Sequence, residues 1–392
     1  MISLNKKIEE KIKIIIYFLL IISAFNIILT FYQKSIIGDL RYLGDSEIYL
    51  CALNKYFSGI NPYGRLDCFG STNMHYHYTP LSLILLFPLN SFDIDFYRIL
   101  WIFIEIFSIL TIFYYSKKIF SLNIDSFILF LLILFSFGGA GWSGFLSGNI
   151  SVILSALILF GIYQLSKNNK FIFSICIIIA TLFKPFLLIF FLVGFKLYKL
   201  DFIKYFFNSI FFLICIHLFY FSLNKELYFN YFEIISFTQT KDFYINLGNG
   251  IGLIGLINGF LYNYGINNLD IILLNFAKFF WLISVFIFSL IFITLKNRNL
   301  DKKTKISYSI ILCSLLNPYL MNYDLFLCVP SILFIFQNNF ILYNKRNNKI
   351  FYFCILIYLI TIHDKFACFF LLSVIIFLFF IKSISNLKTK KI

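Results

Sequence analysis

Long apolar runs recur along the whole 392-residue chain, and they constrain its fold more than any other feature. Runs of about 20 residues match the length that a helix needs to cross the ~30 Å hydrocarbon core of a bilayer. Only 13% of the residues are charged, about half the share found in a soluble domain. Transmembrane β-barrels are excluded, because their strands alternate apolar and polar residues. The sequence therefore predicts an all-α, polytopic integral membrane protein.

The apolar segments predict one membrane domain over residues 1–392, a bundle of about 12 helices with a range of 10–13. Two longer polar segments, 32–78 and 223–268, interrupt it. The apolar segments lie near residues 12–31, 79–92, 96–116, 124–137, 150–165, 171–195, 203–222, 269–295, 306–317, 324–337, 350–362 and 366–382.

Basic residues predict how the bundle is oriented. Four lysines precede the first span and no small-residue cleavage site follows it, so it reads as a signal anchor with a cytoplasmic N-terminus. Alternating the segments from there places both termini in the cytoplasm and both long polar loops on the extracytoplasmic face. Arg98 then falls inside, whereas the pairs Lys117/Lys118 and Lys167/Lys170 fall outside, against the charge rule. Spans two to six stay open, and 79–92 and 124–137 are short enough to be tilted or re-entrant.

Charge and polarity also narrow the class of protein. The net charge of +15 does not indicate a nucleic-acid partner, because the basic clusters flank apolar runs, where they set topology and meet anionic lipids. A channel or transporter would thread polar residues through many spans. Few ionisable residues lie deep in apolar segments, namely Glu105, Lys184, His217 and Lys278. A site at the extracytoplasmic face is therefore the leading interpretation, and the membrane is expected to be a bacterial plasma membrane.

The polar segment 32–78 contains the pattern of a short amphipathic helix. From Asp45 to Gly59 apolar residues recur with a 3.6-residue period. Asp45 stands where a carboxylate caps a helix start, and this capping role is the alternative to any chemistry. Cys51 and Cys68 share the segment and can form a disulfide if it faces an oxidising compartment. The sequence leaves that pairing open.

Five short motifs follow one another in a characteristic order. They are Asp45 with Gly59-Ile60-Asn61-Pro62-Tyr63, then Tyr76-His77-Tyr78-Thr79-Pro80, Gly148-Asn149-Ile150-Ser151, Leu182-Phe183-Lys184-Pro185, and Asn317-Pro318 with Tyr323-Asp324. Together they resemble glycosyltransferase family 87, polyprenyl-phosphate-mannose-dependent mannosyltransferases of the GT-C superfold, over about residues 12–330. Thr79 replaces a proline of the family pattern, and both amide positions of its Gly-Gln-x-Asn differ here.

The resemblance implies an inverting hexosyltransferase. Its donor would be a polyprenyl-phosphate-linked sugar, with mannose as the first expectation, and its acceptor a hydroxyl of a glycolipid or glycan. Another lipid-linked sugar, or a flippase of lipid-linked sugars, is the alternative. No cofactor is firmly implied, and a divalent-metal requirement is left open.

The resemblance assigns Asp45 as the general base that takes the acceptor proton, with Asp39 as its rival. Such a base needs a pKa raised toward neutral pH. Glu47 is expected to be solvated or paired with a cation. Lys184 interrupts an apolar segment, which marks it as a functional residue by default. It either binds the donor phosphate or pairs with Glu105.

The remaining candidates would contact phosphate or sugar. Arg41 is a further cation in the first loop. His75 and His77 are two ligands at most, too few for a convincing metal site, so hydrogen bonding to substrate is the preferred role. Asn149, Tyr323 and Asp324 either contact sugar or shape helix starts.

Overall fold

The computed structural model describes residues 2–37, 42–64, 66–69, 71–122, 124–237, 252, 254, 271–295, 300–318, 320–341, 359–360 and 365–388. They are almost entirely helical. In chain order the elements are α1 (Ile2–Ile37), α2 (Gly44–Phe57), β1 (Leu66–Cys68), β2 (Ser71–Met74), α3 (Pro80–Leu86), η1 (Phe87–Ser91), α4 (Ile94–Phe120), α5 (Ser126–Ser147), α6 (Ser151–Ser166), α7 (Lys170–Phe183), η2 (Pro185–Phe190), α8 (Phe191–Tyr198), η3 (Lys199–Phe202), α9 (Ile203–Leu223), α10 (Lys225–Phe237), α13 (Ile271–Thr294), α14 (Lys302–Leu315), η4 (Asn322–Cys328), α15 (Val329–Ile341) and α17 (Lys365–Lys388). β1 and β2 pair antiparallel.

The predicted class, an all-α membrane protein, agrees with this architecture, but the predicted number of about 12 spans is not confirmed. Within the described residues, three helical stretches are long and apolar enough to cross a membrane: Ile94–Phe120, Ser126–Ser147 and Pro185–Leu223. Other apolar helices, such as α6 and α7, are shorter. Many large apolar side chains face outward from the bundle, including Phe103, Phe107 and Phe211. Such a surface suits contact with lipid rather than with water.

Contacts between distant segments define two ends of the molecule. At one, Lys302 Nζ donates to the Ser166 carbonyl at 2.6 Å and Lys303 Nζ to Ser121 Oγ at 2.7 Å. The hydroxyl of Tyr198 donates to the Leu165 carbonyl at 2.7 Å. The ends of α4, α6 and α8 therefore meet the start of α14. We call this the basic end, and among the described residues its cations include Lys117, Lys118, Lys167, Lys170, Lys196, Lys199, Lys204, Lys302, Lys303 and Lys305.

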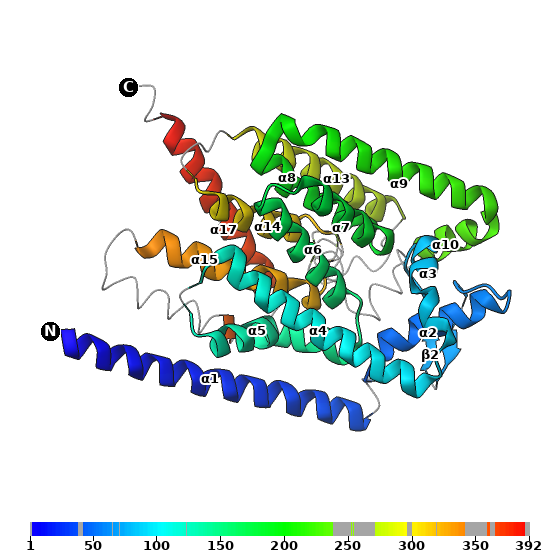
Figure 1. The fold of residues 1–392 in the computed structure, drawn as a ribbon, viewed down its shortest axis with the longest axis horizontal. Coiled ribbons are helices and arrows are strands. Elements are labelled where there is room, and N and C mark those ends of the chain that lie inside the picture. Colours follow the sequence, from blue (N-terminus) through cyan, green and yellow to red (C-terminus); the bar gives the residue numbers. More distant parts are fainter. Residues whose placement is uncertain are drawn as a thin grey trace.

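The opposite end carries Asp45, and we call it the Asp45 end. Figure 1 shows α2, β2, α3 and α10 gathered there, whereas the first turns of α1 and the last turns of α17 lie toward the other side. The Tyr56 hydroxyl of α2 bonds to that of Tyr220, near the end of α9, at 2.7 Å. Most of the long polar segment 223–268, including the glycine-rich stretch that follows α10, lies outside the described residues.

The apolar segment predicted as one span at 171–195 is two antiparallel helices. Lys184 adopts an extended conformation (φ −124°, ψ 98°) between α7 and η2, as expected for a residue that precedes a proline. The chain returns from there to the basic end, where Tyr198 stacks against Lys170 Nζ at 4.5 Å from its ring centre. Lys184 is therefore the apex of a helical hairpin rather than a charge in the middle of a span.

The segment predicted at 79–92 does not cross the bundle. It forms a seven-residue helix and a five-residue 3₁₀ helix, together only about 20 Å long. Thr79 donates a hydrogen bond to the Leu182 carbonyl next to the hairpin apex. After the segment, Arg98 pairs with Glu47 of α2. The segment 79–92 therefore begins and ends at the Asp45 end of the molecule. This arrangement is the re-entrant alternative.

Helix α5 breaks in its middle and so redirects its last turns toward Asp45. Phe137, Gly138 and Gly139 all have positive φ, a conformation that glycine adopts without strain. A Cβ on Gly139 would stand 2.8 Å from Ile27 Cγ2 of α1, so the two helices touch here. The segment predicted at 124–137 ends at this break, and the residues beyond it lead to Gly148 and Asn149.

Candidate active site

Asp45 lies in the first turn of α2, and α2 is held firmly against the bundle. The backbone N–H of Leu43 donates to the Leu146 carbonyl at 2.8 Å, and the Tyr97 hydroxyl donates to the Ser46 carbonyl at 2.7 Å. Gly148 has φ +72°, and a Cβ there would lie 2.9 Å from Ser46 Cβ. Only glycine therefore allows this close approach of α2 to the end of α5.

The expected capping role of Asp45 is wrong. The N-cap of α2 is Leu43, in a left-handed conformation, and no side chain caps the helix. The Asp45 carboxylate turns to another element instead, and its Oδ2 accepts a hydrogen bond from Asn149 Nδ2 at 2.7 Å. The capping alternative fails because the turn before the helix is anchored by the Leu43 backbone.

Asn149 acts on two elements at once. Its Oδ1 accepts from the Ser151 backbone N–H at 2.9 Å, which satisfies an orphan donor in the first turn of α6. Its Nδ2 holds Asp45, and the Tyr323 hydroxyl also bonds to its side chain. The amide is buried, with 3% of its surface exposed. The two roles that the sequence offered as alternatives are therefore compatible.

Lys184 faces two polar partners rather than Glu105. Its ammonium donates to Ser151 Oγ and reaches Asp324 Oδ1 at 3.5 Å. It also lies 5.4 Å from the centre of the Tyr323 ring. Glu105 instead accepts from the Trp101 indole N–H at 3.3 Å. The predicted alternative of a Lys184–Glu105 pair is wrong, because α4 presents Glu105 to Trp101 on its own face.

Asp324 belongs to η4, and its two oxygens have different partners. Oδ2 accepts from the Met321 backbone N–H at 3.1 Å, closing the first turn of η4, while Oδ1 faces Lys184. Gly144 of α5 packs against Tyr323, since a Cβ on that glycine would stand 3.1 Å from Tyr323 Cβ. The Asp324 carboxylate therefore both closes the first turn of η4 and pairs with Lys184.

The environment of Asp45 acts on its basicity in opposite directions. Burial raises the pKa of the Asp45 carboxyl above its ordinary value, whereas hydrogen bonds from Asn149 and Ser147 and the charge of Lys184 lower it. Burial is the largest of these effects, because removing a carboxylate from water disfavours its charged form. A carboxyl with a raised pKa, held by an amide, has the properties of a general base.

A floor of tyrosines supports the site, and only part of it was predicted. Tyr49 accepts from the Ile150 backbone N–H at 3.1 Å, and its hydroxyl bonds to that of Tyr78 at 3.0 Å. Tyr76 is fully buried, and its hydroxyl bonds to that of Ser82 at 2.5 Å. Tyr49 falls on the apolar stripe of α2, and the one sequence signal of its polar role is a hydroxyl within that stripe.

His75 and His77 follow β2, and their rings lie 6.0 Å apart. Burial, together with the neighbouring His75, lowers the pKa of His77 to about 4, so this ring is neutral at physiological pH. Among the described residues, no three His, Cys, Asp or Glu side chains gather closely enough to hold a metal ion. Asp39 and Arg41 lie outside the described residues.

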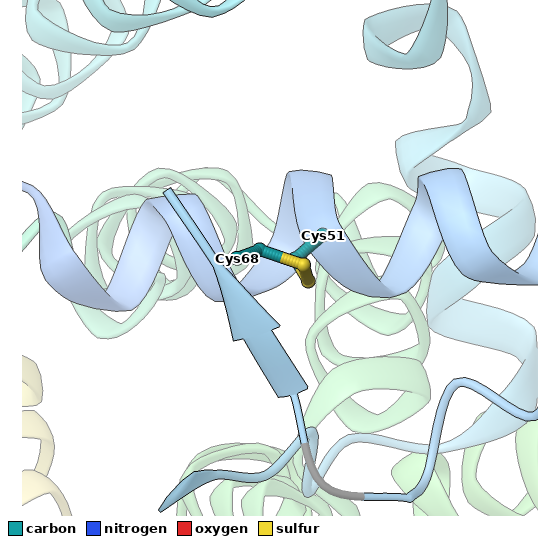
Figure 2. Close-up of a disulfide and its surroundings, with 2 residues drawn as sticks. All are labelled: Cys51 and Cys68. Atoms are coloured by element: carbon teal, nitrogen blue, oxygen red, sulfur yellow. A yellow bond between two sulfur atoms is a disulfide. The ribbon is translucent and has the colours of Figure 1, made fainter. Parts of the chain in front are cut away.

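A disulfide joins Cys51 of α2 to Cys68 of β1, which is the pairing that the sequence left open. Figure 2 shows it bridging the helix and the strand that lies across it. The hairpin β1–β2 leads directly into His75, Tyr76 and His77. The crosslink therefore connects the helix that carries Asp45 to the chain that forms the tyrosine floor.

A cavity opens beside Lys184. Its charged side chains are Lys184 and Asp324, its other polar lining residues are Ser151, Ser155, Ser314 and Asn317, and the rest of its lining is apolar. The apolar walls come from α6, η2, α14 and η4 and include Leu154, Ile158, Phe186, Leu187, Phe190, Cys313 and Leu327. A ligand with one anionic group and an apolar chain matches this distribution of side chains.

A partly buried carboxylate, a buried amide and a lysine at one end of a helical membrane bundle are the parts that a membrane-embedded enzyme needs. Comparison with known families is specific: the profile of glycosyltransferase family 87 matches residues 76–316. The chain belongs to this family and is a membrane glycosyltransferase. None of the curated proteins searched matches it. The matched range contains Asn149 and Lys184, whereas Asp45 precedes it and Asp324 follows it.

Proposed function

We propose that the protein transfers a hexose, with mannose as the first expectation, from a polyprenyl-phosphate donor to a hydroxyl of a glycolipid or glycan acceptor. The observation that carries this is that Asp45, Asn149, Lys184 and Asp324, from four separate parts of the chain, lie together at one end of the bundle. Membership of glycosyltransferase family 87 supports the reaction class.

The proposed reaction is a single displacement. The acceptor oxygen attacks the anomeric carbon, and Asp45 takes the hydroxyl proton. The bond from that carbon to the phosphate oxygen breaks, and its electron pair leaves with the polyprenyl phosphate. Attack from the side opposite the leaving group inverts the anomeric configuration. Lys184 stabilises the charge that develops on the phosphate.

The surroundings of the two charged groups support these roles. Asn149 fixes one orientation of the Asp45 carboxylate, which a positioned base requires. The cavity beside Lys184 joins a cationic rim to apolar walls, and these walls suit the first isoprenyl units of a lipid donor. We assign Asp324 to the rim, and we keep Tyr323, His75, His77 and Arg41 as candidate contacts to sugar or phosphate.

We propose that the Asp45 end faces the extracytoplasmic side. The basic end contains Lys117, Lys118, Lys167 and Lys170, four residues that opposed the charge rule when 79–92 was counted as a span. With that segment re-entrant, all four move to the cytoplasmic side and Arg98 moves out, in better agreement with the rule. The Cys51–Cys68 disulfide supports the same orientation, because disulfides persist in oxidising compartments.

The direct test is sugar transfer from polyprenyl-phosphate-mannose in proteoliposomes. Asp45→Asn keeps the size of the side chain but removes the base, so we expect turnover to fall by about 10²- to 10⁴-fold. The matched control is Asp95→Asn, a carboxylate of the same end that is 84% exposed, and it should leave turnover unchanged. Lys184→Met should raise the donor KM by about tenfold or more, as expected for a lost charge-assisted hydrogen bond.

Three results would contradict the proposal. Unchanged turnover in Asp45→Asn would remove Asp45 as the base, and a loss in Asp39→Asn alone would transfer the role to that residue. A normal donor KM in Lys184→Met would remove the phosphate contact. Movement of lipid-linked sugar between leaflets without any transfer would indicate a flippase instead.

A further inference from the structure

Three lysines from three helices gather around two tyrosine rings at the basic end. Lys170 Nζ of α7 lies 4.5 Å from the centre of the Tyr198 ring and 5.9 Å from that of Tyr205. Lys302 Nζ of α14 lies 5.3 Å from the Tyr198 ring, and Lys204 Nζ of α9 lies 5.2 Å from the Tyr205 ring. We call these five residues the lysine–tyrosine cluster. It lies at the end of the bundle opposite to the candidate active site, and the proposed reaction does not use it.

The positive charge of the cluster has no counterion in the described part of the chain. The ion pairs found there involve Arg98 and Lys184 instead. Of the nearby carboxylates, Asp301 accepts a hydrogen bond from the Thr304 backbone N–H and so caps α14, whereas Asp201 is exposed. The tyrosine rings attract the ammonium groups, but they do not cancel the repulsion between like charges. A bound anion would relieve this repulsion.

The Tyr198 side chain is fixed before any ligand binds. Its hydroxyl donates to the Leu165 carbonyl at 2.7 Å and accepts from Lys302 Nζ at 3.0 Å. Lys302 Nζ also donates to the Ser166 carbonyl at 2.6 Å, so it is held between α6 and α8. An arrangement of cations that is already in place binds an anion at a lower entropic cost than free side chains do.

Apolar side chains beside the cluster indicate what kind of anion fits. Phe171 follows Lys170 and is 64% exposed, and Phe207, one turn beyond Lys204, is 62% exposed. Phe211, a further turn along α9, is 70% exposed. The helices α7 and α9 also pack against each other. A soluble anion would contact the lysines alone, whereas a lipid would cover these outward-facing side chains as well.

We propose that the lysine–tyrosine cluster binds the headgroup of an anionic phospholipid with two phosphates, such as cardiolipin, whose acyl chains lie along α7 and α9. Three ammonium groups exceed the single charge of an ordinary phosphodiester headgroup, and two phosphates match them better. Basic pockets between membrane helices bind such headgroups. The inference does not depend on the proposed reaction. The bound lipid would tie the starts of α7, α9 and α14 together and so stabilise the bundle.

Lipid binding to the purified full-length protein tests the proposal. Cardiolipin, phosphatidylglycerol and phosphatidylethanolamine are titrated separately in detergent, and bound lipid is counted by native mass spectrometry. We expect cardiolipin to bind most tightly. Lys170→Gln with Lys204→Gln should weaken its binding by more than about tenfold, because each lysine contributes about fivefold. Lys302 is kept, since its hydrogen bond to Ser166 joins two helices.

The matched control is Lys117→Gln with Lys118→Gln, which removes the same charge from the same end. These two lysines lie over Phe113 and Tyr114, outside the cluster, so cardiolipin binding should change by less than about twofold. Equal losses in the two double variants would show a diffuse attraction without a site and would overturn the proposal. Equal affinity for cardiolipin and phosphatidylglycerol would overturn the assignment of two phosphates.

Thermal unfolding distinguishes a lipid from a free anion and also shows whether the variants fold. Cardiolipin should raise the unfolding midpoint of the wild type, whereas inorganic pyrophosphate at the same concentration should not. An equal rise with pyrophosphate would overturn the lipid as the occupant. If the double variant does not fold, Lys204→Gln alone, at an exposed position, replaces it. This single change should weaken cardiolipin binding by about fivefold, and unchanged binding would overturn the proposal.

Discussion

Two carboxylates at the start of α2, the half-buried Asp45 and the buried Glu47, have partners of different kinds. Asp45 is held by an amide, Asn149, whereas Glu47 receives hydrogen bonds from Arg98 Nε at 2.8 Å and Nη2 at 2.5 Å. Of the two sequence-based alternatives for Glu47, solvation is wrong and pairing with a cation is confirmed. Asp45 therefore has a neutral hydrogen-bond partner, whereas Glu47 forms an ion pair. At the scale of single residues, the partner decides which carboxylate can do chemistry.

Glu47→Gln is expected to destabilise the protein without removing activity. The glutamine keeps the shape but loses the charge that two guanidinium hydrogen bonds require, so we expect a loss of about 1–2 kcal/mol. The expected loss of stability is small because the Arg98 side chain is 39% exposed and solvent screens its charge. Thermal unfolding in detergent measures the effect.

The control for this change is again Asp95→Asn, whose carboxylate meets the same arginine at 3.4 Å but is largely exposed. It should alter stability by less than about 0.5 kcal/mol. Equal stability of Glu47→Gln and the wild type would show that the Arg98 pair does not hold α2 in place.

At the scale of elements, α2 is the part of the site that depends most on its attachments. It is a 14-residue helix, too short to be stable by itself. Its links to the rest of the bundle are the Leu43–Leu146 hydrogen bond, the Tyr97–Ser46 hydrogen bond and the Cys51–Cys68 disulfide. The position of Asp45 therefore depends on contacts that form only when distant segments come together.

Cys51→Ser with Cys68→Ser is expected to lower both stability and turnover. The disulfide closes a loop of sequence separation 17, for which chain entropy predicts about 3 kcal/mol. Reduction of the wild type with a membrane-impermeant phosphine should reproduce the loss. Cys215→Ser, which changes an exposed free cysteine, is the matched control. Full activity of the double variant after heating to the wild-type midpoint would contradict a stabilising role.

Patterns of neighbouring residues predicted helix α2, and the short motifs named most residues of the candidate site. Asn149, Lys184 and Asp324 were all named, and the structure brings them together around Asp45. The predictions that failed concern contacts between distant segments. They are the partner of Lys184 and the role of Asp45 as a helix cap, which the docking of Leu43 prevents. Side-chain partners across a bundle depend on which helix faces meet, and no local pattern encodes that.

At the scale of the whole molecule, the path of the chain between α2 and α8 determines which loops share a side. From the length of its apolar segments, the sequence predicted that 79–92 crosses the membrane and that 171–195 is a single span. The re-entrant segment and the Lys184 hairpin correct both, and the two errors offset each other in the number of crossings. Hydropathy does not distinguish a helix that crosses from one that turns back at a polar site.

Impermeant-maleimide labelling in intact cells tests the orientation. Asp95→Cys should react from outside, because α4 starts at the Asp45 end, whereas Lys118→Cys at its other end should react only after permeabilisation. The wild type, with its native cysteines, measures the background. The reverse pattern would return α4 to the orientation inferred from hydropathy and place the basic end outside.

The central helices are short. α6 has 16 residues, and α7 and α14 have 14 each, or about 21–24 Å of rise against a hydrocarbon thickness of ~30 Å. Of the three, α7 presents large apolar side chains to the outside, Phe171 and Ile175, so lipid beside it meets a helix shorter than the hydrocarbon core. We expect the bilayer to thin there, which would bring the headgroup of the proposed lipid donor closer to Lys184 at the end of α7. Turnover is then expected to depend on the acyl-chain length of the host membrane.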